Sequence, residues 1–201
     1  MPDFIYLASQ SPRRRQLLEQ IGVRHELLLP GADEDAEGLE ALLAGEDPAV
    51  YVQRVTALKL DAAVERHARR GLAPAPILCS DTTVALSQRI YGKPADEQDA
   101  ARMLSELSGH EHQVLTAVAL QAGARRLAAL SVSHVRFAAM TPAQIAAYVA
   151  SGEPMGKAGA YAIQGPVAQY VENLSGSYTG IMGLPLFETA GLLRAAGVLR
   201  D

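Results

Sequence analysis

The sequence lacks the features that secreted, membrane-spanning and disulfide-linked proteins need. Its 201 residues contain a single cysteine, Cys79, so no disulfide can form within the chain, and the apolar neighbours of Cys79 predict a small buried side chain. No apolar run approaches the roughly 20 residues of a membrane-spanning helix. The chain starts almost directly with a strand-like segment at residues 4–7. We therefore expect a cytoplasmic protein with no membrane association.

Basic residues are also few. The formal net charge is −4, and the longest run of Lys and Arg is the three arginines at positions 13–15. Proteins that bind nucleic acid usually present a broad basic face, so we expect no nucleic-acid partner. The five histidines show no metal-ligand spacing, which predicts no zinc site. A small anionic ligand held by a few local cations fits this composition.

Residues 77–94 combine an apolar run with charged side chains. The apolar segment predicts a buried strand, but Asp81 lies in its middle, flanked by hydroxyl side chains. Because an isolated buried charge is costly, Asp81 should face a polar cleft, with hydrogen-bond donors or a metal ion as its partner. Lys93 follows between a glycine and a proline on a short turn. The segment predicts either an acid/base or metal site that faces a phosphate, or a structural ion pair at a strand end.

Residues 4–21 predict a strand, a short loop and a helix. Ser11 is a suitable N-cap and Pro12 a suitable first helical residue. Such a turn directs backbone N–H groups and the positive end of the helix dipole toward one place, which suits a phosphate group. The arginines at 13–15 lie in the first turn, where a cation opposes the dipole. They indicate either an anionic ligand or an exposed basic turn.

Two further segments offer charged candidates. The acidic loop at residues 33–35 could supply a carboxylate to Mg²⁺, although such loops are more often solvated surface. Asp47 and Pro48 predict the start of a long helix that ends near Gly71. Lys59 lies within this helix beside its buried stripe. Its side chain either reaches a cleft or, more commonly for lysine, extends along the surface into solvent.

The rest of the chain predicts further alternation of helices and strands. The predicted elements are a strand at 25–29, a helix at 96–109, strands at 113–120 and 127–137, a helix at 141–152, a strand at 161–163, a strand to 174 and a helix at 185–197. The apolar pattern changes phase within residues 127–137, which predicts a bulge at Ser133 and His134. Glycines surround Lys157 in residues 152–165, so this segment either wraps a ligand or forms a simple turn.

The chain carries eight short motifs in a fixed order. They are Ala8 to Arg14, Asp33-Glu34, Lys59, Ser80 to Val84, Gly92-Lys93-Pro94, Leu107-Ser108-Gly109, Lys157 to Gly165, and Gly183 to Leu186. Together they resemble the Maf family of nucleoside triphosphate pyrophosphatases, from about residue 4 to residue 196. A single motif would not suffice for this resemblance, whereas eight in the same order leave little room for chance.

The resemblance implies an α/β fold with an elongated mixed β-sheet flanked by helices. It implies that residues 1–201 form one Maf-like domain of two lobes with a nucleotide cleft between them. The implied reaction is hydrolysis of a nucleoside triphosphate to the monophosphate and pyrophosphate, with a divalent metal, Mg²⁺ or Mn²⁺, and Asp81 as the catalytic base. The expected partner is the nucleotide substrate, and a homodimer is the expected assembly.

The resemblance also bears on the choice of substrate. Three motif positions separate branches of the family, and here they are Arg13, Thr82 and Gln164. They resemble the branch that acts on dTTP and UTP, or on modified pyrimidine nucleotides, rather than the branch that acts on 7-methyl-GTP. Two positions depart from the usual pattern: Ala117 replaces a glycine, and Gly180 stands where an asparagine is common. We assign no function to Gly180.

The chemistry of this reaction suits the residues that the motifs supply. Attack of water on the α-phosphorus needs a carboxylate that deprotonates water or holds the metal, and Asp81 and Glu34 can serve. The leaving pyrophosphate needs nearby donors and cations, and the candidate phosphate-binding residues are Ser9, Ser11, Arg14, Lys59, Lys93 and Lys157.

Two other functions use the same residues. A nucleotide-sensing regulator of cell division would bind a triphosphate without hydrolysing it, but a carboxylate beside the α-phosphate would only repel the ligand of such a protein. A house-cleaning pyrophosphatase for altered purine nucleotides would share the chemistry and differ in base selection. Thr82 and Gln164 argue against the latter only through the branch that they resemble.

Overall fold

A computed structural model describes residues 4–32, 34–35 and 38–199. The strands are β1 (Ile5–Leu7), β2 (His25–Leu27), β3 (Ile77–Leu86), β4 (Arg89–Tyr91), β5 (Glu111–Ala122), β6 (Arg125–Phe137) and β7 (Val171–Ser175). The α-helices are α1 (Pro12–Gln20), α2 (Pro48–Arg69), α3 (Glu97–Leu107), α4 (Pro142–Ala150), α5 (Tyr178–Met182) and α6 (Leu186–Ala195). Short 3₁₀ helices are η1 (Gly38–Glu40), η2 (Ala158–Ala160) and η3 (Pro166–Tyr170).

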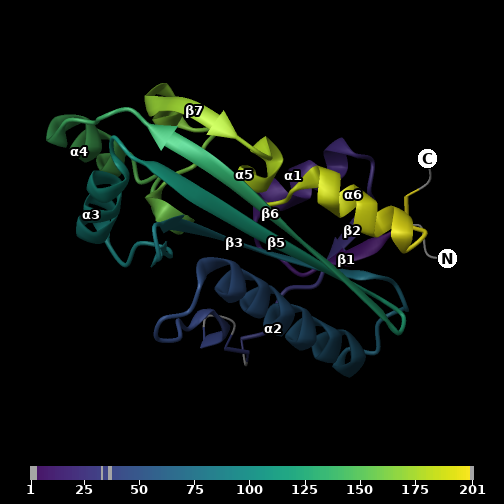
Figure 1. Cartoon of the computed structure of the whole chain (residues 1–201). Coiled ribbons are helices and arrows are strands. Elements are labelled where there is room, and N and C mark those ends of the chain that lie inside the picture. The colour runs from purple at the N-terminus through teal and green to yellow at the C-terminus, as the bar shows by residue number, and fades with distance from the viewer. Residues whose placement is uncertain (1–3, 33, 36–37, 200–201) are drawn as a thin grey trace.

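The strands form one mixed sheet of seven strands in the order β2-β1-β3-β5-β6-β7, with β4 paired to β3. β1 runs parallel to β2 and β3, whereas β3, β5, β6 and β7 pair antiparallel. The long strands β3, β5 and β6 run along most of the length of the molecule (Figure 1). This arrangement confirms the expected elongated mixed sheet flanked by helices.

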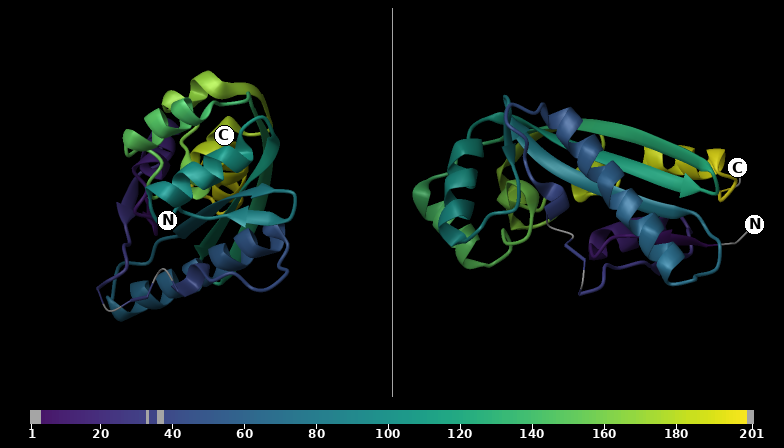
Figure 2. Two further views of the ribbon diagram at one scale, coloured as in Figure 1. Left: turned by 90° about the vertical axis from the view of Figure 1, so that its left-hand side faces the viewer. Right: turned by 90° about the horizontal axis from the view of Figure 1, so that it is seen from below.

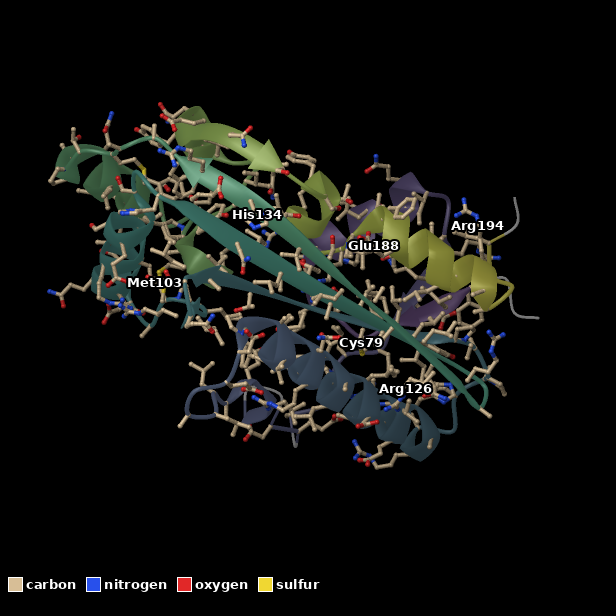
Figure 3. The ribbon with its side chains drawn as sticks, viewed as in Figure 1. Cys79, Met103, Arg126, His134, Glu188 and Arg194 are labelled. Atoms are coloured by element: carbon tan, nitrogen blue, oxygen red, sulfur yellow. The ribbon has the colours of Figure 1, made fainter. Side chains whose placement is uncertain are left out.

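Helices cover both faces of the sheet at the end that holds β1 and β2 (Figure 2). Leu60 and Ala63 of α2 pack with Cys79 on one face, and Cys79 lies between the sheet and α2 (Figure 3). On the other face, α1 and α6 pack against the alternate residues of β3 and β5, such as Leu78 and Val118. Burial raises the pKa of the Cys79 thiol to about 12, as expected for an inert apolar side chain.

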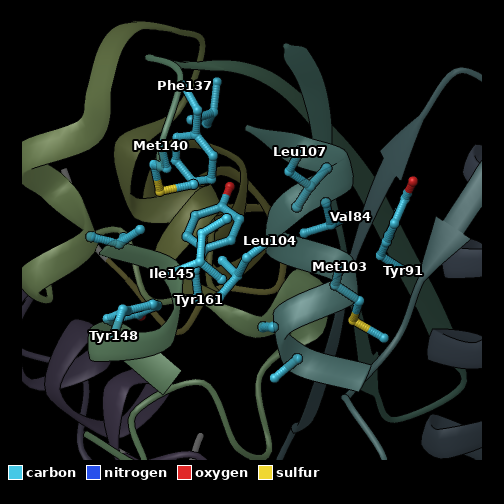
Figure 4. Close-up of a cluster of buried hydrophobic side chains, with 14 of the residues drawn as sticks. Val84, Tyr91, Met103, Leu104, Leu107, Phe137, Met140, Ile145, Tyr148 and Tyr161 are labelled. Carbon is cyan, nitrogen blue, oxygen red and sulfur yellow. The ribbon is translucent and has the colours of Figure 1, made fainter. Parts of the chain in front are cut away.

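A separate apolar cluster fills the other end of the sheet. Phe137, Met140 and Leu104 surround the ring of Tyr161, and α3 and α4 each supply further side chains, such as Met103 and Ile145 (Figure 4). His112 lies in this cluster, 2% exposed, with Nε2 2.8 Å from the Tyr161 hydroxyl. Because burial disfavours the charged ring, the pKa of His112 falls to about 4.

Three helices start at the predicted caps, whereas Ser11 at the start of α1 makes no side-chain capping hydrogen bond. The side chain of Asp47 accepts from the N–H groups of Ala49 and Val50 at the start of α2, and Asp96 caps α3 in the same way. Thr141 and Gln144 form a reciprocal capping box at the start of α4. No helix in the described ranges is long and apolar enough to cross a membrane.

Two local predictions were wrong. β5 and β6 keep an unbroken register through Ser133 and His134, so no bulge lies there. The pattern changed phase because Ser133 is buried, with Oγ accepting from the N–H of Ser177, while Val132 is 39% exposed. Residues 161–163 are buried but not a strand, since the chain turns here and the N–H of Gly165 bonds to the carbonyl oxygen of Ala162.

Candidate active site

A cavity of about 500 Å³ lies beside the middle of β3, bordered by the start of α1, by α2 and by the segments at 155–158 and 181–183. It brings together most of the candidates that the sequence predicted. Those that line it are Ser9, Ser11, Arg13, Arg14, Lys59, Asp81, Thr82, Lys93 and Lys157. These residues come from segments far apart in the sequence, so the fold gathers them.

Asp81 and Lys59 form the centre of this arrangement. Asp81 is 9% exposed on β3, opposite Ala117 of β5. The Nζ of Lys59, from α2, lies 2.5 Å from Asp81 Oδ1. The lysine therefore reaches the cavity rather than extending into solvent, and it supplies the partner that a buried carboxylate requires.

Arg14 connects the loop after β1 to the rest of the site. Its Nε donates to the carbonyl oxygen of Gly183 at 2.7 Å, and Nη1 donates to Ser9 Oγ at 3.1 Å. Its Nη2 lies 3.4 Å from Thr82 Oγ1. Burial lowers the pKa of Arg14, while the nearby Asp81 opposes that shift. These hydrogen bonds hold the guanidinium in a defined position, where it can bind an anion.

A second pair of cations borders the cavity near residues 182–183. Arg13 Nε donates to the carbonyl oxygen of Met182 at 3.2 Å. Lys157 Nζ donates to the carbonyl oxygen of Glu153. Burial and then the positive charge of Arg13 lower the pKa of Lys157. Two positive charges on the same side of the cavity make it attractive to an anion.

The side chain of Thr82 is held by a hydrogen bond from Thr116 of the neighbouring strand β5. Thr116 Oγ1 lies 3.0 Å from Thr82 Oγ1 and 2.8 Å from the carbonyl oxygen of Gly180. Ser80, on the same face of β3, donates to the carbonyl oxygens of Ala117 and Gly183. The segment at 180–183 therefore serves the site through backbone oxygens, which the sequence could not indicate because any residue type provides them.

Glu34 does not line the cavity. Arg66 holds its carboxylate through Nε and Nη2 at 2.6 to 3.0 Å, and Arg69 Nη2 adds a contact at 2.9 Å. The hydrogen bond from Arg66 is the main reason that the pKa of Glu34 falls to about 2. The predicted role of Glu34 as a metal ligand stays a prediction, and its neighbour Asp33 lies outside the described residues.

Glu40 is one of two charged residues, with Arg66, that the sequence did not single out among the described residues of the cavity lining. From η1 its carboxylate accepts from Lys59 Nζ at 2.8 Å and from Lys93 Nζ at 3.1 and 3.2 Å. It lies in a polar, glycine-interrupted stretch, and a single 3₁₀ turn has no apolar period that would have predicted it. In the described ranges, no three His, Cys, Asp or Glu residues lie close enough to bind one metal ion.

Gln164 lies away from these residues. Its side chain is exposed, and it is not among the residues that line the cavity. The buried neighbours Ile163 and Tyr161 pack in the core, and Tyr161 also borders the cavity. Base reading by Gln164 therefore stays a prediction.

Comparisons with known proteins agree on the family. Residues 4–196 match the family described as Maf-like protein. A protein of Polaromonas sp. named dTTP/UTP pyrophosphatase is 69% identical over 196 residues, covering 98% of this chain and 97% of that protein. Proteins of the same name from Albidiferax ferrireducens and Cupriavidus metallidurans are 64% and 63% identical, covering 98% of this chain and 98% and 99% of theirs.

A solved structure gives a weaker likeness. The nucleoside-triphosphatase named dITP/XTP pyrophosphatase from Mycobacterium abscessus superposes with a TM-score of 0.42 and 15% identity, over 66% of this chain and 73% of that one. That likeness is too low to support an argument. The match to residues 4–196 and the identity with full-length relatives carry the conclusion instead: the chain belongs to the Maf-like protein family.

Proposed function

We propose that the protein is a nucleoside triphosphate pyrophosphatase that hydrolyses dTTP and UTP to the monophosphate and pyrophosphate. One observation carries the proposal: Asp81 and Lys59 meet in a cavity that Arg14 and Lys157 also line. A carboxylate among convergent cations suits attack by water on a polyphosphate. The names of the full-length relatives support the choice of substrate.

Asp81 acts on the attacking water in this proposal. Lys59 donates to Oδ1 and so fixes the orientation of the carboxylate. Asp81 takes a proton from water as the water oxygen bonds to the α-phosphorus. The bond from the α-phosphorus to the bridging oxygen then breaks, and pyrophosphate leaves. A base held in this way contributes about 10²- to 10⁴-fold to the rate.

The cations stabilise negative charge as pyrophosphate leaves. Arg14 is anchored by Ser9 and Gly183, so its guanidinium is fixed before the substrate binds. Lys93 and Lys157 approach from the other segments that border the cavity. The loop from Ser9 to Ser11 and the start of α1 offer N–H groups and the positive end of a helix dipole to phosphate oxygens.

The residues fit a divalent metal only in part. Mg²⁺ commonly takes one or two carboxylates together with phosphate oxygens of the substrate, and Asp81 can provide the protein ligand. When bound, the metal would neutralise phosphate charge and favour ionisation of water. Glu34 is already held by two arginines, so Asp81 is the residue that we expect to hold the metal.

A panel of nucleoside triphosphates with Mg²⁺ tests the proposal. We expect dTTP and UTP to give the monophosphate and pyrophosphate, with higher kcat/KM than CTP, GTP, ITP and XTP. Release of orthophosphate would contradict the reaction. Tight binding of dTTP without turnover would indicate a nucleotide sensor, and preference for ITP or XTP would indicate an altered-purine pyrophosphatase.

Gln164 is our proposed reader of the base, together with Arg13 and Thr82. A carboxamide presents one donor and one acceptor, which match the N3–H and a carbonyl oxygen of thymine or uracil. In Gln164→Glu two acceptors would oppose each other, so we expect kcat/KM for dTTP and UTP to fall about 10- to 100-fold. Steady-state kinetics with dTTP, UTP, CTP and GTP measure this. An equal loss for all four substrates, or no loss, would contradict the assignment.

A further inference from the structure

The carboxylate of Glu40 occupies donors that the proposed function gives to the substrate. It contacts Lys59 Nζ at 2.8 Å and Lys93 Nζ at 3.1 Å, and its side chain is 28% exposed within the cavity lining. Lys59 Nζ also contacts Asp81 at 2.5 Å. The lysine that supports the proposed base therefore shares its charge between two carboxylates, only one of which belongs to the reaction.

Glu40 is held in place by more than its two lysines. Tyr51 donates from its hydroxyl to the backbone oxygen of Glu40 at 3.0 Å. Next along the chain, Arg54 Nη2 donates to the carbonyl oxygen of Ala41 at 2.9 Å, and Arg54 pairs with both carboxylate oxygens of Glu46. The turn that carries Glu40 is thus fastened to α2 at several points, and its carboxylate has a defined position.

Glu40 is ionised at neutral pH. Burial raises its pKa, but the charges and hydrogen bonds of Lys59 and Lys93 outweigh burial and lower the pKa below the ordinary glutamate value. A phosphoryl oxygen and this carboxylate would need the same ammonium donors and would repel each other at that distance. With Glu40 in place, the two lysines have fewer free N–H groups and less uncompensated charge to offer a phosphate.

We propose that Glu40 is a built-in competitor for polyphosphate, which sets how much negative charge a ligand must bring to bind Lys59 and Lys93. A polyphosphate carries enough charge to displace the carboxylate, whereas a weakly charged anion does not. The inference rests on the proposed function, because it takes Lys59 and Lys93 as the groups that bind the phosphate chain. It adds a residue that selects ligands by charge rather than by base.

The opposite role for Glu40 makes a different prediction. If Glu40 and Asp81 together held Mg²⁺, Glu40 would assist the metal complex of the ligand instead of opposing the ligand. Lys59 lies between the two carboxylates, with its ammonium bonded to both. Because the Lys59 ammonium already occupies the place between the carboxylates, competition with phosphate is favoured over a shared metal ion. Removing the metal distinguishes the two roles, since only a metal ligand depends on Mg²⁺ for its effect.

Inorganic pyrophosphate is the probe, with its affinity measured by calorimetry in EDTA. Glu40→Gln keeps the shape and removes the charge, so it should bind pyrophosphate about three- to tenfold more tightly than the native protein. Glu40→Ala should shift the affinity in the same direction. Glu172→Gln on β7 is the matched control, because it removes one charge from an ion pair with Arg136 of β6, and it should change the affinity less than about twofold.

Equal or weaker binding by both Glu40 variants in EDTA would overturn the proposal, provided that melting curves show folded proteins. Weaker binding by Glu40→Gln that is seen only when Mg²⁺ is present would also overturn it, because that result would identify Glu40 as a metal ligand. If neither the native protein nor the variants bind pyrophosphate, the proposal also falls. Hydrolysis of dTTP by the native protein would still uphold the proposed function in each case, so the two failures are distinguishable.

Discussion

The carboxylate of Asp81 and the ammonium of Lys59 depend on each other. Asp81 lies in a strand whose neighbours are almost all buried, and Lys59 Nζ at 2.5 Å supplies the compensating charge. The pattern of residues 77–86 already predicted a buried carboxylate that needs a partner. It could not identify the partner, because Lys59 is far away in the sequence and its place on a helix also suits an exposed lysine.

Asp81→Asn tests the proposed base directly. The amide preserves the shape but cannot accept a proton from water, so we expect kcat for dTTP to fall about 10²- to 10⁴-fold. Binding of dTTP should persist, because Arg14 and Lys93 remain in the cavity. Asp61→Asn, at an exposed ion pair on α2, is the control for loss of one charge. Near-normal kcat in folded Asp81→Asn would rule out this role.

Glu34→Gln tests whether Glu34 is structural. We expect a loss of about 1–3 kcal/mol of unfolding free energy at pH 7, because the variant loses its charged hydrogen bonds to Arg66 and Arg69. The folded pKa of about 2 lies below the ordinary 4.5, so the carboxylate stabilises the fold above pH 4.5. The difference in unfolding free energy between the native protein and the variant should therefore shrink as the pH falls from 4.5 toward 2.

Urea unfolding across this pH range measures the difference in unfolding free energy between the native protein and Glu34→Gln. Glu65→Gln, on the exposed face of α2, is the control. The Mg²⁺ concentration for half-maximal activity should be the same in Glu34→Gln and the native protein. A large rise in that concentration without a loss of stability would show that Glu34 is a metal ligand after all.

At the scale of elements, short polar segments escaped prediction. Asp47, Asp96 and Thr141 marked the starts of α2, α3 and α4, because a cap is a local interaction between neighbours in the sequence. The bulge predicted at Ser133 in β6 was wrong, since the burial of Ser133 depends on the N–H of Ser177, which is distant in the sequence. The turn that carries Glu40 is also held by contacts with α2 that no local pattern contains.

Gly159 shows how closely η2 packs on the sheet beside the cavity. Its φ is +68°, and an added Cβ would lie 2.8 Å from Val84 Cγ2. Gly123, at the turn between β5 and β6, has a φ of +58° with no atom within 4 Å of the same position. An alanine at either position would therefore have a strained left-handed backbone, but only at Gly159 would its Cβ also clash with a neighbouring side chain.

Gly159→Ala should destabilise the protein more than Gly123→Ala. Both variants carry the cost of a left-handed alanine, about 1 kcal/mol, and Gly159→Ala should lose a further 1–3 kcal/mol or so from overpacking against Val84. Urea unfolding of the two variants measures the difference. Equal losses would mean that η2 moves away from β3 without penalty.

At the scale of the whole molecule, the cavity lies beside the middle of β3, with apolar clusters at both ends of the sheet. The cluster around α1 and α6 supports the first turn of α1, which holds Arg14, and the cluster around Tyr161 supports the segment that holds Lys157. The order of the motifs predicted the mixed sheet and most residues that line the cavity. The division of residues 1–201 into two lobes, a homodimer and a cytoplasmic location stay predictions.

Hydrolysis of dTTP in ¹⁸O-labelled water, with Mg²⁺ and mass spectrometry of both products, tests the central claim most directly. If Asp81 directs water to the α-phosphorus, the label enters dTMP and the pyrophosphate remains unlabelled. The same pattern with UTP would extend the result to the second substrate. Label in the pyrophosphate would place the attack on the β-phosphorus and contradict the account.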